Sequence, residues 1–259
     1  SAGILARLGE HGRLLALDKD PQAVDHAQRS FAADARFSIS HGGFEDPRKH
    51  TEPWLGAHPL AGVLLDLGVS SPQLEASERG FSFSTDGPLD MRMNPTEGIT
   101  AAEWLRQVDE SELTDVLRRL GEEPRARQIA WAILKARGKA PITTTGELVE
   151  IIMSVSGGRV SRIHPATRTF QAIRICINDE LKNLRLGLRA CASLLAEGGR
   201  LCVISFHSLE DRIVKRFMAR EAKGDPVYAG LPDVPLEARP TLRLLGGLTR
   251  PSQREIEAN

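Results

Sequence analysis

Short apolar runs alternate with an amphipathic helical pattern over the first part of the chain. Runs at 13–17, 36–40 and 61–66 each end at polar or turn residues, which is typical of parallel strands. The third run is unbroken and predicts a strand that is buried on both faces. A helical pattern capped by Asp20 follows the first run. This alternation of strand and helix predicts an α/β fold with a doubly wound parallel sheet.

A series of helical patterns then interrupts this alternation. They lie at 101–107, 111–120, 126–137 and 144–154, with no strand pattern between them. We therefore expect a helical insertion over residues 99–163, within an α/β domain formed by residues 1–98 and 164–259. The sequence after the insertion predicts a long helix over 166–196, a strand at 200–205, a basic helix to about 223 and a candidate strand at 241–245.

A long irregular segment, residues 80–93, precedes the helical patterns. It is rich in Gly, Ser and Asp, yet it also carries Phe81, Phe83, Met91 and Met93. Long loops without regular structure inside a compact domain are usually functional, so we expect this loop to help hold a substrate.

Composition excludes a few classes of protein. The chain has 34 Lys and Arg against 34 Asp and Glu, and 41% of its residues are hydrophobic, which is ordinary for a globular domain. No apolar run is long enough for a membrane helix and no signal-peptide pattern is present, so we expect a cytoplasmic protein with no membrane partner. Cys176, Cys191 and Cys202 lack Cys-x-x-Cys spacing and lie in apolar patterns, so we expect buried thiols and no metal site.

Charge is uneven despite the zero sum. Residues 118–168 contain ten Lys or Arg and four Glu. This excess fits a surface that faces phosphates, although a solvated helical face explains it equally well. Aromatic residues make up only 5% of the chain, which argues against an extended platform for stacking single-stranded nucleic acid.

Polar residues gather where the predicted strands end, which is where open α/β sheets bind ligands. Asp66 ends the third strand and a loop of small residues, 68–73, follows it. Asp18 ends the first strand, where an acid can accept hydrogen bonds from two ribose hydroxyls of a nucleotide-like cofactor. Either acid could also simply end a strand. Phe44 follows two glycines after the second strand, where it could lie against an adenine, although a phenylalanine at the core edge is the favoured interpretation.

Two further polar clusters follow the helical patterns. One runs from His164 to Gln171 at the start of the long predicted helix, and the other from Ser205 to Arg212 after the returning strand. We expect the topology to bring these two clusters and the Asp66 loop to the same edge of the sheet, although a single His or Arg usually has a structural role.

Five of these segments are long enough to be compared with known motifs: Leu64–Leu74, Arg79–Phe83, Asp86–Met93, His164–Gln171 and Ser205–Lys215. They closely resemble the motifs of the bacterial 16S ribosomal RNA cytosine-N4 methyltransferase family, and the likeness extends from Ser1 to Asn259. The resemblance implies a Rossmann-like class I methyltransferase domain with an inserted all-helical subdomain, and we expect the insertion, residues 99–163, to be the RNA-substrate domain. It also implies S-adenosylmethionine as methyl donor and, as substrate, the N4 of a cytidine in the decoding region of 16S rRNA in the small ribosomal subunit.

The resemblance assigns roles to individual residues. It implies that Asp18 binds the ribose and Phe44 the adenine, and that Asp66 and Gln73 border the cofactor and the target amine. The catalytic candidates are Asp66, Ser70, Ser71 and His207, and the candidates for RNA contacts are Arg92, His164, Arg168, His207 and Arg212. We also expect a Gly-rich cofactor loop before Ser1 and a final strand after Asn259.

Two alternatives from other classes stay open at this point. A nicotinamide-dependent oxidoreductase would use Asp18 equally well, and a ribosome-assembly factor could bind RNA without catalysis. The sequence leaves open whether the protein is a monomer or a homodimer.

Overall fold

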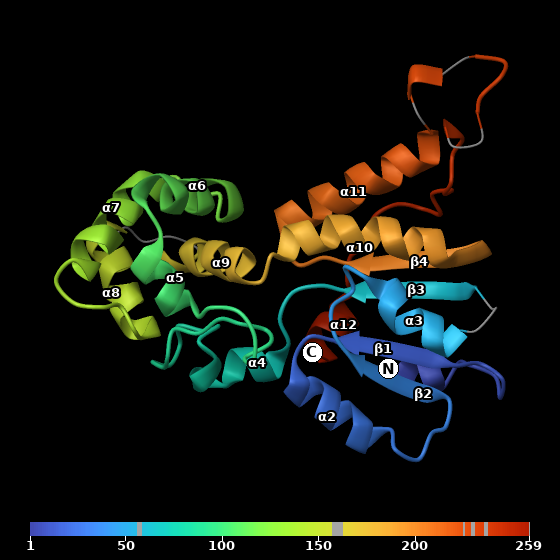
Figure 1. The fold of residues 1–259 in the computed structure, drawn as a ribbon, viewed down its shortest axis with the longest axis horizontal. Helices are drawn as coiled ribbons and strands as arrows, with labels where there is room; N and C mark the ends of the chain where they lie inside the picture. The colour runs from blue at the N-terminus through green and yellow to red at the C-terminus, as the bar shows by residue number, and fades with distance from the viewer. Residues whose placement is uncertain (56–58, 157–162, 225, 229–230, 236–237, 259) are drawn as a thin grey trace. The chain divides into compact units, whose positions relative to one another are not determined.

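The computed structural model describes residues 1–55, 59–156, 163–224, 226–228, 231–235 and 238–258 (Figure 1). The chain divides into two compact units, Ser1–Phe206 and His207–Asn259, and each unit is treated separately below. The helical insertion falls inside the first unit, so its status as a domain of its own over residues 99–163 stays a prediction.

The strands of the first unit form two parallel pairs, so the predicted parallel direction is confirmed, whereas a single doubly wound sheet that joins both pairs stays a prediction. β1 (Leu14–Asp18) pairs with β2 (Phe37–His41), and β3 (Leu60–Asp66) pairs with β4 (Leu195–Ile204). The helices of this part are α1 (Ala2–Leu5), α2 (Pro21–Ser30) and α3 (Pro47–Leu55). Asp20 caps α2 as predicted, since its carboxylate accepts a hydrogen bond from the N–H of Gln22 at 3.0 Å.

The prediction that β3 is buried on both faces is wrong. Leu65 is only 6% exposed, but Leu64, its neighbour on the opposite face, is 49% exposed, and Ile204 on the same face of β4 is 45% exposed. Cys202 of β4 is also exposed, whereas Cys191 is buried. An apolar run predicts a strand, but the number of its faces that are covered depends on what packs against it. Among the described residues, one face of this pair is open.

The long helix predicted over 166–196 is broken into α9 (Ala166–Ile177) and α10 (Glu180–Leu194). The break lies at Asn178 and Asp179, and Asp179 has a left-handed φ of 52°. The side-chain amide of Asn178 donates to the carbonyl of Met91 at 2.7 Å and accepts from the N–H of Met93 at 2.8 Å. The apolar periodicity continues across the break, so the sequence pattern does not reveal it. The hydrogen bonds that Asn178 makes at the break join it to residues far away in the chain, and such bonds do not alter the periodicity.

The helical series appears nearly as predicted. It comprises α5 (Ala101–Gln107), α6 (Glu110–Leu120), α7 (Ala126–Arg137) and α8 (Thr145–Ser156), which pack with α9 (Figure 1). The 80–93 segment contributes to the core of this group: Phe81, Leu89 and Met91 are 6%, 1% and 0% exposed. Phe81 and Met91 are therefore core residues, and a role of the loop in holding a substrate stays a prediction.

The remaining short elements were not all foreseen. The loop after β3 contains α4 (Ser71–Glu75) and the 3-10 turn η1 (Ser77–Arg79). The second unit contains α11 (Ser208–Lys223), η2 (Pro226–Tyr228) and α12 (Gln253–Ala258).

The candidate strand at 241–245 is not a strand. Thr241 instead binds the end of α11, because its N–H donates to the carbonyl of Glu221 at 2.9 Å and its hydroxyl to the carboxylate of Glu221 at 2.8 Å. Among the described residues, no helix combines the length and apolar character that a membrane crossing requires.

Candidate functional site

Both acidic strand ends lie where the parallel sheet topology predicts them. Asp18 is in register with His41, and Asp66 with Ile204, so each acid stands at the carboxyl end of a parallel pair. Asp66 is exposed. The pairing extends one step beyond it, since the N–H of Leu67 donates to the carbonyl of Ile204 at 3.1 Å.

Phe206 lies beside this strand end and was not singled out from the sequence. Its side chain is 68% exposed, and its ring lies against Gly68, where a Cβ would come within 3.2 Å of it. Gly68 also has a φ of 89°, which favours glycine. The close approach of ring and backbone therefore requires glycine at this position, and it places an exposed aromatic ring next to the Asp66 loop.

The loop after Asp66 is shaped by a capping box. The hydroxyl of Ser70 accepts from the N–H of Gln73 at 3.4 Å, and the side-chain oxygen of Gln73 accepts from the N–H of Ser70 at 3.0 Å. These bonds hold the start of α4, and Ser71 is its exposed first residue. Ser70 thus has a structural use, and a catalytic role for Ser70 and Ser71 stays a prediction.

Gln73 also belongs to a buried polar cluster with Asp20 and Arg79. The carboxylate of Asp20 accepts from the amide nitrogen of Gln73 at 2.8 Å and from the guanidinium of Arg79 at 2.7 Å. Asp20, Arg79 and Gln73 are 3%, 6% and 7% exposed. Both ends of the Gln73 side chain are therefore occupied, so the geometry supports a positioning residue that connects the loop after β1 to the loop after β3.

Arg79 extends the cluster to the 80–93 loop. Its second terminal nitrogen donates to the carbonyls of Arg92 and Met93 at 3.1 and 2.9 Å. One guanidinium thus joins the Asp20 carboxylate to the end of that loop. Sequence reasoning missed the cluster, because Asp20 looked like a helix cap and Arg79 like one more motif residue.

Asp18 is held in a partly buried position. Its carboxylate accepts from the N–H of Asp20 at 2.8 Å. Burial raises the pKa of Asp18 above its ordinary value of 3.8, and the nearby charge of Asp20 adds to this, while the hydrogen bond from Asp20 and the charge of His41 oppose it. Asp18 therefore loses hydration without gaining a full set of partners within the protein.

A polar pocket of about 540 Å³ opens next to Asp18. Its lining includes Lys19, the neighbour of Asp18, and His41, its register partner, together with Gly42, Arg92 and Asn178. It is thus formed by the ends of β1 and β2, the 80–93 loop and the α9–α10 break. Phe44 packs elsewhere, with its ring against Gly187 of α10. This is how an aromatic residue at the core edge packs, and an adenine contact by Phe44 stays a prediction.

Arg92, a candidate for RNA contact, binds residues near it in the chain. Its guanidinium forms two hydrogen bonds of 2.7 Å with the two carboxylate oxygens of Asp90, which raises the pKa of Arg92, and it also donates to the carbonyl of Gly98 at 3.2 Å. A phosphate would have to compete with Asp90 for this guanidinium.

His164 and Arg168 lie with the helical group. The ring of His164 stacks on Phe83 with centroids 4.6 Å apart, and its Nδ1 accepts from the N–H of Ala166 at 3.2 Å at the start of α9. Arg168 donates to the carbonyl of Glu122 at 3.2 Å. Both residues are exposed. Their RNA contacts stay predictions, as does their convergence with the Asp66 loop.

His207 and Arg212 belong to the second unit. His207 precedes α11, and its Nε2 lies 3.2 Å from a carboxylate oxygen of Glu210, which is 2% exposed. The other carboxylate oxygen of Glu210 accepts from the N–H of His207 at 3.4 Å. His207 therefore helps to begin α11, and Arg212 is exposed on the first turns of that helix. Roles for both residues in substrate binding stay predictions.

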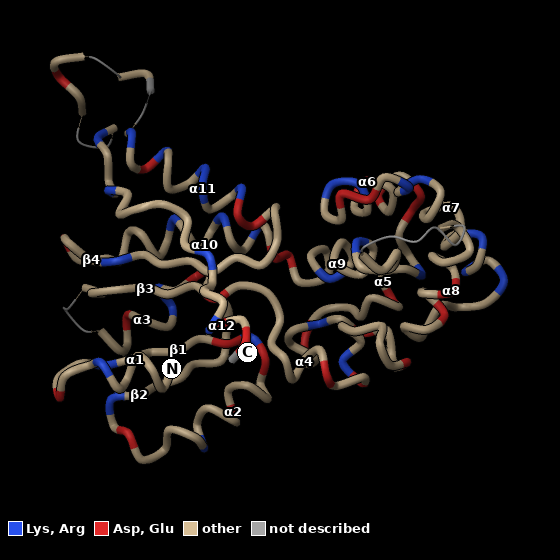
Figure 2. The backbone as a smooth tube through the Cα atoms, turned by 180° about the vertical axis from the view of Figure 1, so that it is seen from behind, with Lys and Arg blue, Asp and Glu red and all other residues tan. Residues whose placement is uncertain are grey.

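Lys and Arg recur along α6 and α7 (Figure 2), but not all of them face solvent. Arg125 donates to the carbonyl of Val155 at 3.0 Å, and Arg137 donates to the carbonyls of Leu105 and Val108, each at 2.6 Å. These two cations hold the helices together, so only part of the positive charge that the sequence places in this region is available to phosphates.

Parallel strands that end in acids beside a polar pocket are typical of α/β proteins that bind nucleotide-like cofactors. Within that class the chain belongs to the MraW methylase family, whose model matches residues 1–259. It is thus a methyltransferase, which confirms the resemblance found in the sequence and decides against the oxidoreductase alternative.

Curated relatives match over nearly the whole chain. One is ribosomal RNA small subunit methyltransferase H of Stenotrophomonas maltophilia strain K279a, which is 52% identical over 257 residues (99% of this chain and 79% of the relative). Proteins of the same name from Coxiella burnetii strain Dugway 5J108-111 and Xylella fastidiosa strain 9a5c are each 51% identical. These matches cover 100% and 99% of this chain, and 84% and 82% of the relatives.

Proposed function

We propose that this chain transfers a methyl group from S-adenosylmethionine to the exocyclic N4 of a cytidine of 16S rRNA, in the decoding region of the small ribosomal subunit. The observation that carries the proposal is the exposed Asp66 carboxylate at the end of β3, next to the exposed ring of Phe206. The relatives, which are named as small-subunit ribosomal RNA methyltransferases, supply the class of substrate.

The residues around Asp18 fit a cofactor of the nucleoside type. A carboxylate at the end of β1 suits two ribose hydroxyls, and the neighbouring pocket of about 540 Å³ is within the usual range for small-molecule sites. Its lining is polar and includes the side chains of Lys19, His41 and Asn183. S-adenosylmethionine, when bound, supplies an electrophilic methyl group.

The exocyclic amine of cytosine is a weak nucleophile, because its lone pair is delocalised into the ring. A carboxylate that accepts a hydrogen bond from this amine would localise the lone pair and take the proton as the new N–C bond forms, the methyl–sulfur bond breaks and S-adenosylhomocysteine leaves. We assign this role to Asp66. The capping box of Ser70 and Gln73 keeps the following loop in place, so that Asp66 acts by positioning as well as by accepting the proton.

The target base has to leave its stack to reach Asp66, as bases do in other enzymes that modify them. The exposed Phe206 ring lies against Gly68, two residues after Asp66, and offers a surface on which the displaced pyrimidine can stack. Phe206 is therefore a further candidate for holding the displaced base, in addition to the 80–93 loop.

Replacing Asp18 by Asn should lower the affinity for the methyl donor but raise the unfolding temperature at neutral pH. Loss of a charge-assisted hydrogen bond to ribose should weaken S-adenosylmethionine binding by roughly 10- to 100-fold, measured by calorimetry. Because burial raises the pKa of Asp18, its ionised form opposes folding above the ordinary value of 3.8. D18N should therefore unfold at a higher temperature than the parent at neutral pH, and this gain should vanish as the pH falls towards 3.8. Unchanged affinity would remove Asp18 from the cofactor site.

The proposed function is tested by incubating the protein with small ribosomal subunits and methyl-labelled S-adenosylmethionine. We expect label in 16S rRNA, and mass spectrometry of nuclease digests should place it on N4 of one cytidine. Naked 16S rRNA and large subunits serve as comparison substrates. Binding of small subunits without transfer would favour the assembly-factor alternative, and label on carbon or on another base would refute the N4 assignment.

A further inference from the structure

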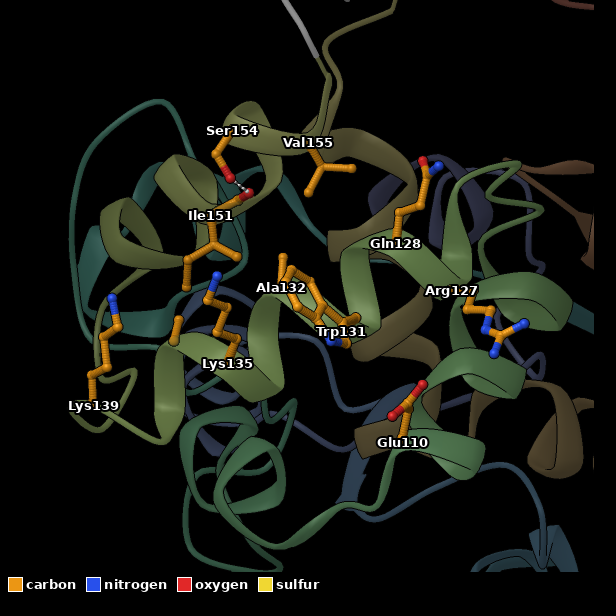
Figure 3. A pocket seen from close by; sticks show the side chains of 11 residues that line it. Glu110, Arg127, Gln128, Trp131, Ala132, Lys135, Lys139, Ile151, Ser154 and Val155 are labelled. Carbon is orange, nitrogen blue, oxygen red and sulfur yellow. Dashed lines mark hydrogen bonds between the residues drawn. The ribbon is translucent and has the colours of Figure 1, made fainter.

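The helical group carries a groove that none of the roles above uses. It has a volume of about 820 Å³ and lies along α7, with α8 on one side and α6 at one end (Figure 3). Its floor is apolar and includes Ala132, Ala136, Ile151 and Val155. The groove belongs to the first unit and is separate from the Asp18 and Asp66 strand ends.

One face of α7 supplies the chemistry of the groove. Arg127, Trp131 and Lys135 are spaced four residues apart, and Lys139 continues the spacing just beyond the helix. Trp131 stands in the middle, with Arg127 to one side of it and both lysines to the other (Figure 3). The sequence therefore places one aromatic ring in a row of three positive charges.

Trp131 is unusual in its exposure. Its side chain is 55% exposed, whereas Trp104 in the same helical group is 8% exposed. The ammonium of Lys135 lies 4.7 Å from the centroid of the Trp131 ring, so the ring already holds a cation on its electron-rich face. A tryptophan at the surface with cations beside it offers stacking and charge at one place.

The groove cations are not used to hold the protein together, in contrast to Arg125 and Arg137. Within the described part of the chain, no acidic group lies within ion-pair distance of Arg127, Lys135 or Lys139. Glu110 is the one acid that lines the groove among the described residues, so the lining carries a net positive charge. Charge of this sign is complementary to a phosphate backbone.

We propose that this groove binds a single-stranded segment of RNA, with one unstacked base on Trp131 and the flanking phosphates on Lys135, Lys139 and Arg127. The inference rests on the proposed function, since it takes the substrate to be RNA, and it identifies where RNA binds away from the methylated base. Base–aromatic stacking tolerates any sequence, because every base has a π face. A single ring is enough for one anchoring base, which agrees with the low aromatic content of the chain.

The test measures binding of a fluorescein-labelled single-stranded RNA of about ten nucleotides to the full chain by anisotropy. W131A should weaken binding roughly 5- to 100-fold, as expected for the loss of one base–aromatic stack. W131F should retain most of the affinity, because it keeps a ring. The Trp131 side chain lies at the surface, so W131A should fold normally, and a thermal melt checks this.

Matched charge variants separate the groove from general positive charge. K135A and K139A should each weaken binding and reduce the slope of log affinity against log salt by about 0.7, the value for one phosphate contact of a single strand. R118A serves as the control, because Arg118 lies on α6 with its side chain 60% exposed and does not line the groove. An equal effect of R118A and K135A would overturn the proposal.

Three further results would overturn it. The first is that W131A binds the RNA as tightly as the parent protein. The second is that an RNA duplex binds as tightly as the single strand. The third is that W131A has an unchanged KM for small subunits in the methyl-transfer assay. The last result counts only if the parent protein methylates those subunits. A parent that binds the single strand through Trp131 but transfers no methyl group would refute the proposed function and leave the groove as an RNA site.

Discussion

Replacing Arg79 by methionine is expected to lower the free energy of unfolding by about 3–5 kcal/mol, as for other buried ion pairs that lose one partner. Arg79 and Asp20 are 6% and 3% exposed, and their side chains meet at 2.7 Å. Without the guanidinium, the Asp20 carboxylate stays buried with the amide of Gln73 as its remaining long-range partner. Urea unfolding monitored by circular dichroism measures the change.

The chain contains a matched control for this prediction. Arg29 and Asp25 form the same kind of pair at 2.6 Å, but their side chains are 73% and 63% exposed. R29M should therefore cost at most about 0.5 kcal/mol, because exposed pairs contribute little. The double variant D20N/R79M should recover part of the loss, since it removes the buried charge itself. Equal costs for R29M and R79M would show that the buried cluster is not important for stability.

R79M should also change the proposed cofactor site. Arg79 binds the carbonyls of Arg92 and Met93 as well as Asp20, so its loss frees both the 80–93 loop and the turn after β1. We expect a higher KM for the methyl donor at temperatures where the variant is still folded. An unchanged KM would limit the cluster to a role in folding.

Replacing Asp66 by Asn is expected to lower kcat for methyl transfer by roughly 10²- to 10⁴-fold, the usual contribution of a group that accepts a proton in the transition state. Asparagine has the same shape but cannot take the proton from the cytosine amine. Asp66 is exposed and does not belong to the buried cluster, so the fold should be unaffected. Single-turnover transfer to small subunits measures the effect on chemistry.

Cofactor affinity provides the contrast for Asp66. Binding of S-adenosylhomocysteine by D66N should stay close to that of the parent, whereas D18N should bind it weakly. D115N is a suitable control, because Asp115 is a carboxylate on α6 that is 58% exposed. If D66N transfers methyl groups at the parental rate, another group accepts the proton.

Local patterns predicted much of the fold. The helical series came out within about two residues of the expected bounds, and both Asp20 and the strand-end acids were located correctly. Periodicity and capping depend on neighbours a few residues apart, so they can be read from the chain directly. The same patterns could not show that Asn178 breaks the long helix, because its partners Met91 and Met93 lie 87 and 85 residues away.

The candidate site was predicted less completely than the fold. Gln73 was expected to border the cofactor and the target amine; its side chain is buried and bonded to Asp20 and to the N–H of Ser70, and the contact with a ligand stays a prediction. Phe206 was not singled out, although it is exposed beside the Asp66 loop. Of the basic residues in the helical segment, Arg125 binds a backbone carbonyl, whereas Lys135 lines an open groove. Residue type alone does not show whether a basic side chain binds a backbone carbonyl or lines a groove, since this depends on the groups within a few ångströms of it.

The sequence by itself determined the parallel α/β class, the methylase family and the two acids at the strand ends, because these follow from short-range patterns and motif order. The tertiary structure alone decided which polar side chains meet. Asp20 is separated from Gln73 by 53 residues and from Arg79 by 59, yet the three form one buried cluster. Such contacts arise only when packing removes the side chains from water, since a buried charge has to find its partner wherever the chain brings one.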